Sequence, residues 1–235
     1  MNTSNSSLTP PSPGGFWKES RALVDLIQMP APLLMATLQP KPQAPNVRVV
    51  TVPGFGADDW SMLPIRKFLK ARGFQADGWG LGRNLAGLNL THDLGALSER
   101  WDVADRDEDN GEAGVPYLVD RLYDLLVDRY SDSKRPIALV GWSLGGYLAR
   151  EAARDLPQMV DRVITLGSPV IGGPKYTATA KRFRDLGQDL DWIETEIARR
   201  ESRPIQQPIT SIYSKSDAIV NWPAAIDHHS RNVHL

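Results

Sequence analysis

The sequence predicts an α/β fold in which helices cover both faces of a mostly parallel central sheet. Apolar, β-branched runs of strand length recur along the chain, and segments of helical periodicity separate them. Strands that alternate with helices in this way join in parallel within one sheet. The 235 residues, of which 41% are hydrophobic and 23% charged, suffice for one substantial core.

The beginning of the chain is predicted to lie outside the sheet. Residues 1–15 are rich in Ser, Pro and Gly, a composition that favours a flexible leader over packed structure. Residues 16–28 predict a short amphipathic helix, and the Pro-rich residues 39–45 predict an extended connector. We therefore place the folded domain at residues 16–235.

The next elements follow from the hydrophobic pattern. We expect an apolar strand, a glycine-containing loop, a helix, a short second strand, a long polar loop and an amphipathic helix. These segments span residues 47–52, 53–60, 62–72, 73–79, 81–112 and 115–130, respectively.

The most informative stretch is residues 137–153, a buried-type strand, then Gly-Trp-Ser-Leu-Gly, then a helix-forming segment. A strained backbone holds a serine hydroxyl at the tip of such a turn, and Gly141 and Gly145 remove Cβ atoms that would collide. The N-terminus of the following helix directs free N–H groups and partial positive charge to the same point. The pattern predicts Ser143 as a nucleophile; the alternative is an ordinary turn whose serine caps the helix.

The last third of the chain completes the alternation. Strands are predicted at residues 162–169 and 209–214, and residues 232–235 predict the start of a final strand. Between the first two, residues 176–201 predict one or two charged helices. The surrounding insert, about residues 171–203, has the place of a lid.

Three aromatic side chains of this insert are candidates for substrate binding. Tyr176, Phe183 and Trp192 are predicted to line an acyl pocket; the alternative is that they pack the insert onto the sheet. Trp142, beside the predicted nucleophile, is expected in the core.

Backbone donors are predicted opposite Ser143, because loops beyond the carboxyl ends of parallel strands share one cleft. The Pro-Gly-Phe-Gly loop at 53–56 lets the backbone approach a substrate closely. The N–H groups of Phe55 and Leu144 are therefore predicted to form an oxyanion hole. The alternative is a plain loop whose glycines serve packing.

A carboxylate partner is predicted at Asp217, just after the strand at 209–214. Its role would be to orient a histidine and stabilise the imidazolium; the alternative is a turn-forming aspartate. Asp185, Asp189 and Asp191 are expected to be solvated charges on the insert.

Four motifs occur in a set order: Val-Pro-Gly-Phe-Gly at 52–56, Gly-Trp-Ser-Leu-Gly at 141–145, Leu-Gly-Ser-Pro at 166–169 and Tyr-Ser-Lys-Ser-Asp-Ala-Ile-Val at 213–220. Together they resemble the α/β-hydrolase superfamily, most closely its bacterial triacylglycerol-lipase-like and esterase-like branch. The likeness covers about residues 46–235. It implies the α/β-hydrolase fold and a serine hydrolase that cleaves carboxylic esters through an acyl-enzyme.

The sequence departs from this family at the histidine base. In the family, a Ser-His-x-Gly-like turn follows the strand after the acid loop, whereas here the sequence stops at Leu235. His234 alone follows the acid near the correct strand, although its place inside a strand argues against a loop tip; His92, His228 and His229 are the other candidates. We expect a fragment whose base lies further on; the alternative is a complete chain with little or no triad activity.

Composition limits the partners. A net charge of −1 gives no basic field for nucleic acid or anionic lipid, and the absence of cysteine excludes a thiolate metal site. Neither a signal peptide nor a membrane-spanning stretch is visible. We expect a cytoplasmic protein that acts on a small-molecule ester without cofactor or metal. The alternatives are a non-catalytic protein that binds a small apolar or acyl ligand, and an acyltransferase.

Overall fold

The computed structural model describes residues 8–10, 47–88 and 114–235. The helix predicted at 16–28 and part of the polar loop predicted at 81–112 lie outside these residues. Every structural statement below concerns the described residues.

A fully parallel sheet forms the centre of the described structure. Its six strands lie in the order β2-β1-β3-β4-β5-β6, which confirms the predicted mostly parallel sheet. In chain order the strands are β1 (Arg48–Val52), β2 (Gln75–Gly78), β3 (Ile137–Trp142), β4 (Val160–Leu166), β5 (Ile209–Tyr213) and β6 (Arg231–His234).

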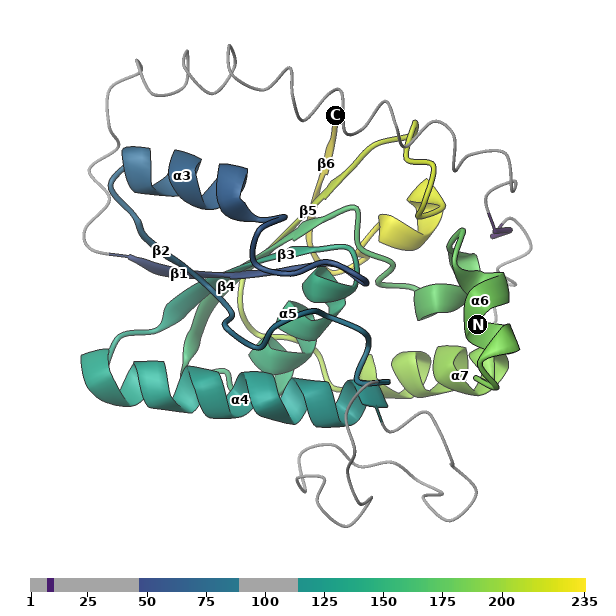
Figure 1. Ribbon diagram of the computed structural model, residues 1–235, viewed down its shortest axis with the longest axis horizontal. Coiled ribbons are helices and arrows are strands. Elements are labelled where there is room, and N and C mark those ends of the chain that lie inside the picture. Colours follow the sequence, from purple (N-terminus) through teal and green to yellow (C-terminus); the bar gives the residue numbers. More distant parts are fainter. Residues whose placement is uncertain (1–7, 11–46, 89–113) are drawn as a thin grey trace.

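Helices lie on both faces of the sheet, as predicted (Figure 1). One face is covered by α3 and the other by α4 and α5, whereas α6 and α7 stand beyond one end of the strands (Figure 1). The helical elements are α3 (Leu63–Ala71), α4 (Gly114–Ser133), α5 (Leu144–Asp155), the 3₁₀ turn η4 (Gly173–Tyr176), α6 (Ala180–Asp185), α7 (Leu190–Arg200) and the 3₁₀ turn η5 (Trp222–Ala225).

The two layers follow from the alternation of side chains along each strand. Val49 and Val140 belong to the apolar cluster beneath α3. Their neighbours Val50 and Leu139 point the other way, into the larger cluster formed with Leu148 and the other buried residues of α4 and α5. Because both of their faces are buried, the central strands β1 and β3 are almost entirely apolar, as buried parallel strands usually are.

The strand register brings the carboxyl ends of the strands to one edge. Val52 lies opposite Gly141, Trp142 opposite Leu166, and Leu166 opposite Ile212. The loops after β1, β3, β4 and β5 therefore leave the sheet side by side. The insert that contains α6 and α7 stands beyond this same edge (Figure 1).

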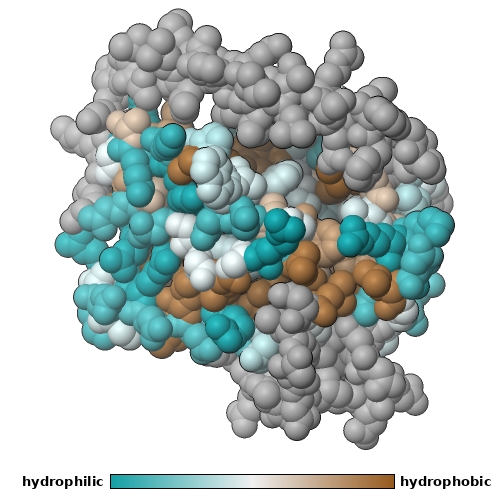
Figure 2. All heavy atoms as spheres, in the orientation of Figure 1, coloured by the Kyte–Doolittle hydropathy of each residue, from teal (hydrophilic) through white to brown (hydrophobic). Residues whose placement is uncertain are grey.

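The surface has mixed character. In the orientation of Figure 1, apolar side chains gather in a band across the lower half of the molecule, along the side on which α4 and α7 lie (Figure 2). Within the described ranges, no helix combines the length and apolar character that crossing a membrane requires.

Candidate active site

Ser143 occupies a sharp turn between β3 and α5. Its backbone dihedrals are φ 52° and ψ −124°, a conformation that residues with a Cβ rarely adopt and that stores about 1–3 kcal/mol of strain. The Ser143 N–H donates to the carbonyl of Leu166 over 2.9 Å, and the Gly146 N–H donates to the Ser143 carbonyl over 2.9 Å. The predicted sequence of strand, sharp turn and helix is therefore present.

Two glycines allow the chain to close around this turn. A Cβ on Gly141 would lie 2.3 Å from the carbonyl oxygen of Gly145, and a Cβ on Gly145 would lie 2.2 Å from that of Val52. Both neighbours are backbone atoms, which cannot turn aside as a side chain can. Any larger residue would therefore push the start of α5 away from β3 or from β1.

The predicted backbone donors lie beside Ser143. A Cβ on Gly54 would stand 3.2 Å from the Cβ of Ser143, so the loop after β1 passes directly next to the serine. Phe55 and Leu144 both line the same pocket as Ser143. Their N–H groups donate no hydrogen bond to another described residue. Two unused donors at the N-terminal end of α5 suit a developing negative charge.

Ser143 lines an apolar pocket. It lies between the loop after β1, the start of α4 and the insert formed by η4, α6 and α7. Apart from Ser143, its lining consists of Phe55, Ala86, Leu88, Val115, Pro116, Leu144, Tyr147, Pro169, Gly173, Pro174, Thr177, Thr179, Phe183, Gln188, Trp192, Ile193, Glu196 and Ile197. Such a lining fits an apolar group next to the serine.

The insert places its three predicted aromatic residues differently. Phe183 and Trp192 line the pocket, and the ring of Phe183 packs against that of Phe55 with centroids 4.9 Å apart. Tyr176 is buried but does not line the pocket. Its hydroxyl donates to Glu194 over 2.6 Å, and burial together with this bond raises the pKa of Tyr176 to about 12. The structure thus gives Tyr176 a packing role.

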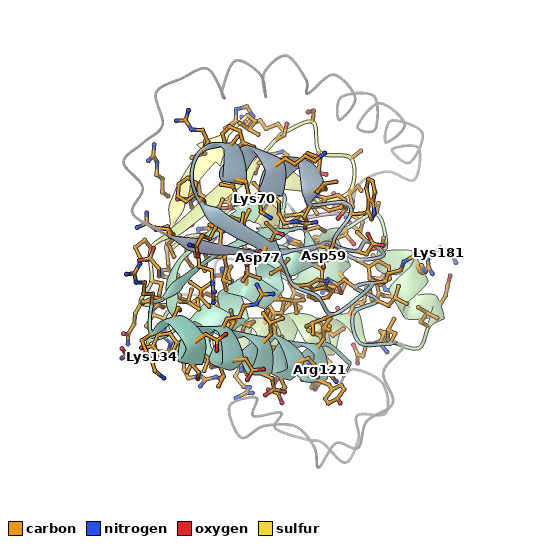
Figure 3. All side chains as sticks on the ribbon, turned by 60° about the vertical axis from the view of Figure 1, so that its left-hand side comes forward. Asp59, Lys70, Asp77, Arg121, Lys134 and Lys181 are labelled. Atoms are coloured by element: carbon orange, nitrogen blue, oxygen red, sulfur yellow. The ribbon has the colours of Figure 1, made fainter. Side chains whose placement is uncertain are left out.

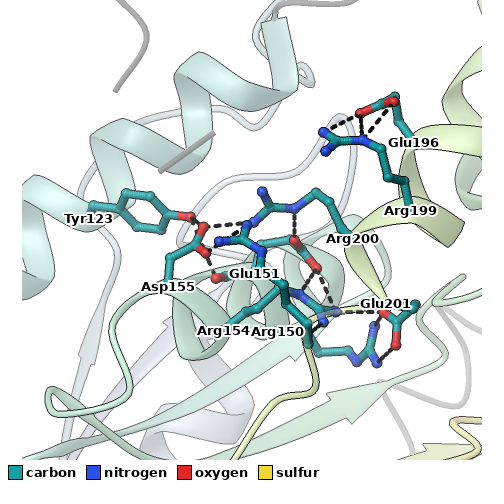
Figure 4. A network of polar contacts seen from close by, with 10 residues as sticks. Tyr123, Arg150, Glu151, Arg154, Asp155, Glu196, Arg199, Arg200 and Glu201 are labelled. Carbon is teal, nitrogen blue, oxygen red and sulfur yellow. Dashed lines mark hydrogen bonds and ion pairs between the residues drawn. The ribbon is translucent and has the colours of Figure 1, made fainter. Parts of the chain in front are cut away.

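A buried ionic cluster joins the end of α7 to α5 (Figure 4). Glu151 forms ion pairs with Arg154, at 3.3 Å, and with Arg200. Arg200 also pairs with Asp155 at 2.7 Å, and Asp155 accepts a hydrogen bond from Tyr123. Since α5 begins directly after Ser143, the cluster anchors the insert to the helix that follows the serine turn.

Arg150 extends this cluster toward the segment before β6. Its guanidinium pairs with Glu201 at 3.0 Å and with the buried carboxylate of Asp227 at 2.9 Å. Burial lowers the pKa of Arg150, but the two carboxylates more than offset this effect, and the net shift is upward. The guanidinium of Arg150 thus connects α5, the insert and the segment before β6.

Asp217 lies after β5, as predicted. Its Oδ1 accepts the N–H groups of Ile219, at 2.8 Å, and Val220, at 3.0 Å. Its Oδ2 lies 2.8 Å from the point that a Cβ on Gly167 would occupy, immediately beyond β4. Burial raises the pKa of Asp217 despite the two backbone donors. The carboxyl group therefore stands near the serine turn with one oxygen free of hydrogen bonds from other described residues.

No histidine of the described ranges lines the pocket. His234 is exposed on β6, opposite Tyr213, and its ring packs against that tyrosine with centroids 5.3 Å apart. Because β6 is three strands from β3, their backbones are about 14 Å apart. The structure does not bring His234 to Ser143. His228 and His229 are also exposed, and His92 lies outside the described residues.

Trp142 corrects a further expectation. It is 39% exposed and not part of the core. Two residues beyond Val140 on the same strand, it points to the α3 face at the strand end and packs over Gly54. The charges of Asp185, Asp189 and Asp191 are exposed, as expected.

Sequence reasoning missed part of the pocket. Ala86 and Leu88 come from the predicted polar loop and Val115 and Pro116 from the start of a predicted helix, and neither segment carries a chemical signal for binding. It also missed Asn84, a buried amide that contacts the loop of Phe55. The only available signal was the position of Asn84 in a glycine-containing loop after a strand.

The chain is similar to a known protein family in sequence and to solved structures in fold. The sequence profile of the alpha/beta hydrolase family matches residues 49–233. No curated protein sequence matches the chain.

Solved structures share the fold. The mature form of Bacillus licheniformis lipase BlEst2 superposes with a TM-score of 0.53 at 15% identity, over 82% of this chain and 85% of the lipase. Aspergillus fumigatus lipase B superposes with a TM-score of 0.52 at 16% identity, over 84% of this chain and 46% of that enzyme.

Proposed function

The chain belongs to the alpha/beta hydrolase family, and from that premise we propose that it hydrolyses carboxylic esters through an acyl-enzyme formed on Ser143. The observation that supports this most is the strained backbone of Ser143, which lines an apolar pocket. The unused N–H groups of Phe55 and Leu144 line the same pocket. A merely structural serine needs none of these features.

The proposed reaction proceeds in two steps. Ser143 Oγ attacks the ester carbonyl, and the N–H groups of Phe55 and Leu144 stabilise the resulting oxyanion. The C–O bond to the alcohol then breaks, and the alcohol departs with a proton. In the second step water attacks the acyl-enzyme, releases the carboxylic acid and regenerates the Ser143 hydroxyl. Each step requires a base; in this reaction the base is a histidine, and Asp217 would orient its imidazole ring.

The apolar lining of the pocket favours substrates with an apolar acyl group. Phe183, Trp192, Ile193 and Val115 are among the apolar side chains that line the pocket. Burying a methylene group in such a pocket contributes about 0.8 kcal/mol. The rate should therefore rise with acyl chain length until the pocket is filled.

A second function is favoured by one observation: none of the described histidines lines the pocket. Without a base in place, the same cleft would bind a small apolar or acyl ligand without turning it over. Loss of a triad member in other serine hydrolases leaves only about 10³- to 10⁴-fold catalysis over water.

Ester hydrolysis by the full-length protein separates the two functions. We expect turnover of p-nitrophenyl esters that depends on chain length and is lost in Ser143→Ala. Binding of an apolar fluorescent probe without ester turnover would favour the non-catalytic function. Equal turnover by Ser143→Ala and the wild type would contradict the role of Ser143.

The pocket assignment has its own test. Phe183→Ala should shift the preferred acyl chain length, because it removes a wall of the pocket. Leu186→Ala is the matched control, since Leu186 belongs to the same insert, is 53% exposed and does not line the pocket. An identical chain-length profile for both variants would contradict the assignment.

A further inference from the structure

Asn84 has a buried side chain that takes no direct part in the proposed reaction. It lies in the loop after β2 and is 0% exposed, although its amide is strongly polar. Burying an amide is costly unless each polar group finds a partner. The partners of Asn84 therefore indicate what it does.

Those partners bracket Phe55. Asn84 Nδ2 donates to the Pro53 carbonyl over 2.8 Å. The backbone of Asn84 adds two bonds: its carbonyl accepts the Gly56 N–H over 2.6 Å, and its N–H donates to the Ala57 carbonyl over 2.8 Å. Three hydrogen bonds thus hold the chain on both sides of Phe55 while its own N–H stays unused.

The loop that contains Asn84 is itself held in place. Asn84 Oδ1 accepts the N–H of Ala86 at 3.1 Å. Asp59, labelled in Figure 3, accepts the N–H groups of Trp79 and Gly80, each at 3.0 Å, and so ties the loop after β2 to the loop after β1. The amide of Asn84 is therefore presented from a fixed backbone.

The geometry points to Asn84 as a positioning residue that sets where the Phe55 N–H lies relative to Ser143. The inference rests on the proposed function, because the location of this donor matters only if an oxyanion forms. Gly54 and Gly56 give the loop little conformational preference of its own, and Gly56 has a φ of +76°. An oxyanion donor must stand within hydrogen-bond distance of the charge that develops. A displacement of 1 Å costs about 100-fold in rate.

The test compares two matched substitutions in the full-length protein. Asn84→Ala removes an amide that donates to a proline carbonyl. Gln207→Ala removes the same kind of bond, from Gln207 Nε2 to the Pro157 carbonyl over 2.8 Å, at the opposite end of the strands. Each variant is measured for kcat and KM on a p-nitrophenyl ester, for the inhibition constant of a trifluoromethyl ketone, and for urea unfolding.

We expect Asn84→Ala to lower kcat by about 10- to 100-fold with little change in KM, since a displaced donor acts on the transition state alone. The trifluoromethyl ketone, which forms a tetrahedral adduct, should bind more weakly by a similar factor. Gln207→Ala should retain the wild-type kcat and inhibition constant. Asn84→Asp keeps the size of the side chain and its acceptor but removes the donor. If Asn84→Ala does not fold, this variant should show the same loss in kcat.

Two results would overturn the inference. If the folded Asn84 variants show the kcat and ketone inhibition of Gln207→Ala, Asn84 serves packing only. If KM rises while kcat stays at the wild-type value, the substitution weakens binding that substrate and transition state share, and not an interaction with the oxyanion. A wild-type protein without esterase activity would overturn the proposed function, and this inference with it.

Discussion

Replacing Ser143 with glycine should give a more stable protein than replacing it with alanine. Ser143 has φ 52° and ψ −124°, which strain any residue with a Cβ but which glycine adopts freely. Both substitutions remove the hydroxyl, and only the glycine removes the Cβ. The comparison therefore isolates the backbone strain of the turn.

The expected magnitude is the difference between two opposing effects. Relief of the strain contributes about 1–3 kcal/mol. The greater freedom of glycine in the unfolded chain costs about 0.5–1 kcal/mol. Ser143→Gly should thus exceed Ser143→Ala in the free energy of unfolding by up to about 2.5 kcal/mol. In a domain of this size each kcal/mol shifts Tm by about 2–4 °C.

Thermal unfolding of the two variants tests this expectation, with Ala198→Gly as the control. Ala198 is an exposed residue of α7, where glycine should cost about 1 kcal/mol. The reasoning predicts opposite signs at the two sites. If Ser143→Gly melts below Ser143→Ala by as much as the control loses, the turn is not strained and the elbow interpretation is wrong.

Three further predictions concern charged and titratable groups. Burial raises the pKa of Asp217, so ionising this carboxyl group destabilises the fold as the pH rises above the ordinary aspartate pKa of 3.8. Asp217→Asn should therefore have a higher Tm than the wild type at neutral pH. A difference in Tm that does not depend on pH would contradict this. Glu151→Gln should lower the free energy of urea unfolding by about 3–5 kcal/mol, because two buried arginines lose a partner. As its control, Lys181→Ala at an exposed ion pair on the outside of α6 (Figure 3) should change the free energy of unfolding by about 0.5 kcal/mol or less. His234→Ala should leave ester turnover close to wild type, and a loss as large as that of Ser143→Ala would contradict its observed placement.

The fold and the strained turn that holds Ser143 were predictable because their signals are local. The strands and the turn around Ser143 each depend on residues close together in the sequence, and the glycines at 141 and 145 act within that turn. Alternation of strands with helices then selects a parallel sheet.

The errors and omissions have long-range causes. Trp142 was expected in the core, but strand alternation directs it to the face where it packs over Gly54 and remains partly exposed. Tyr176 bonds to Glu194, 18 residues away, and Asn84 bonds to Pro53, 31 residues away. Neither pairing has a periodic signature, so only the folded chain shows it.

The most direct test of the central claim is the site of acylation. The full-length protein is mixed briefly with a p-nitrophenyl ester, quenched in acid, digested and examined by mass spectrometry. The proposed function predicts the acyl mass on the peptide that contains Ser143, and its absence in Ser143→Ala. Ester turnover with acylation at another residue, or with equal acylation of both proteins, would contradict it.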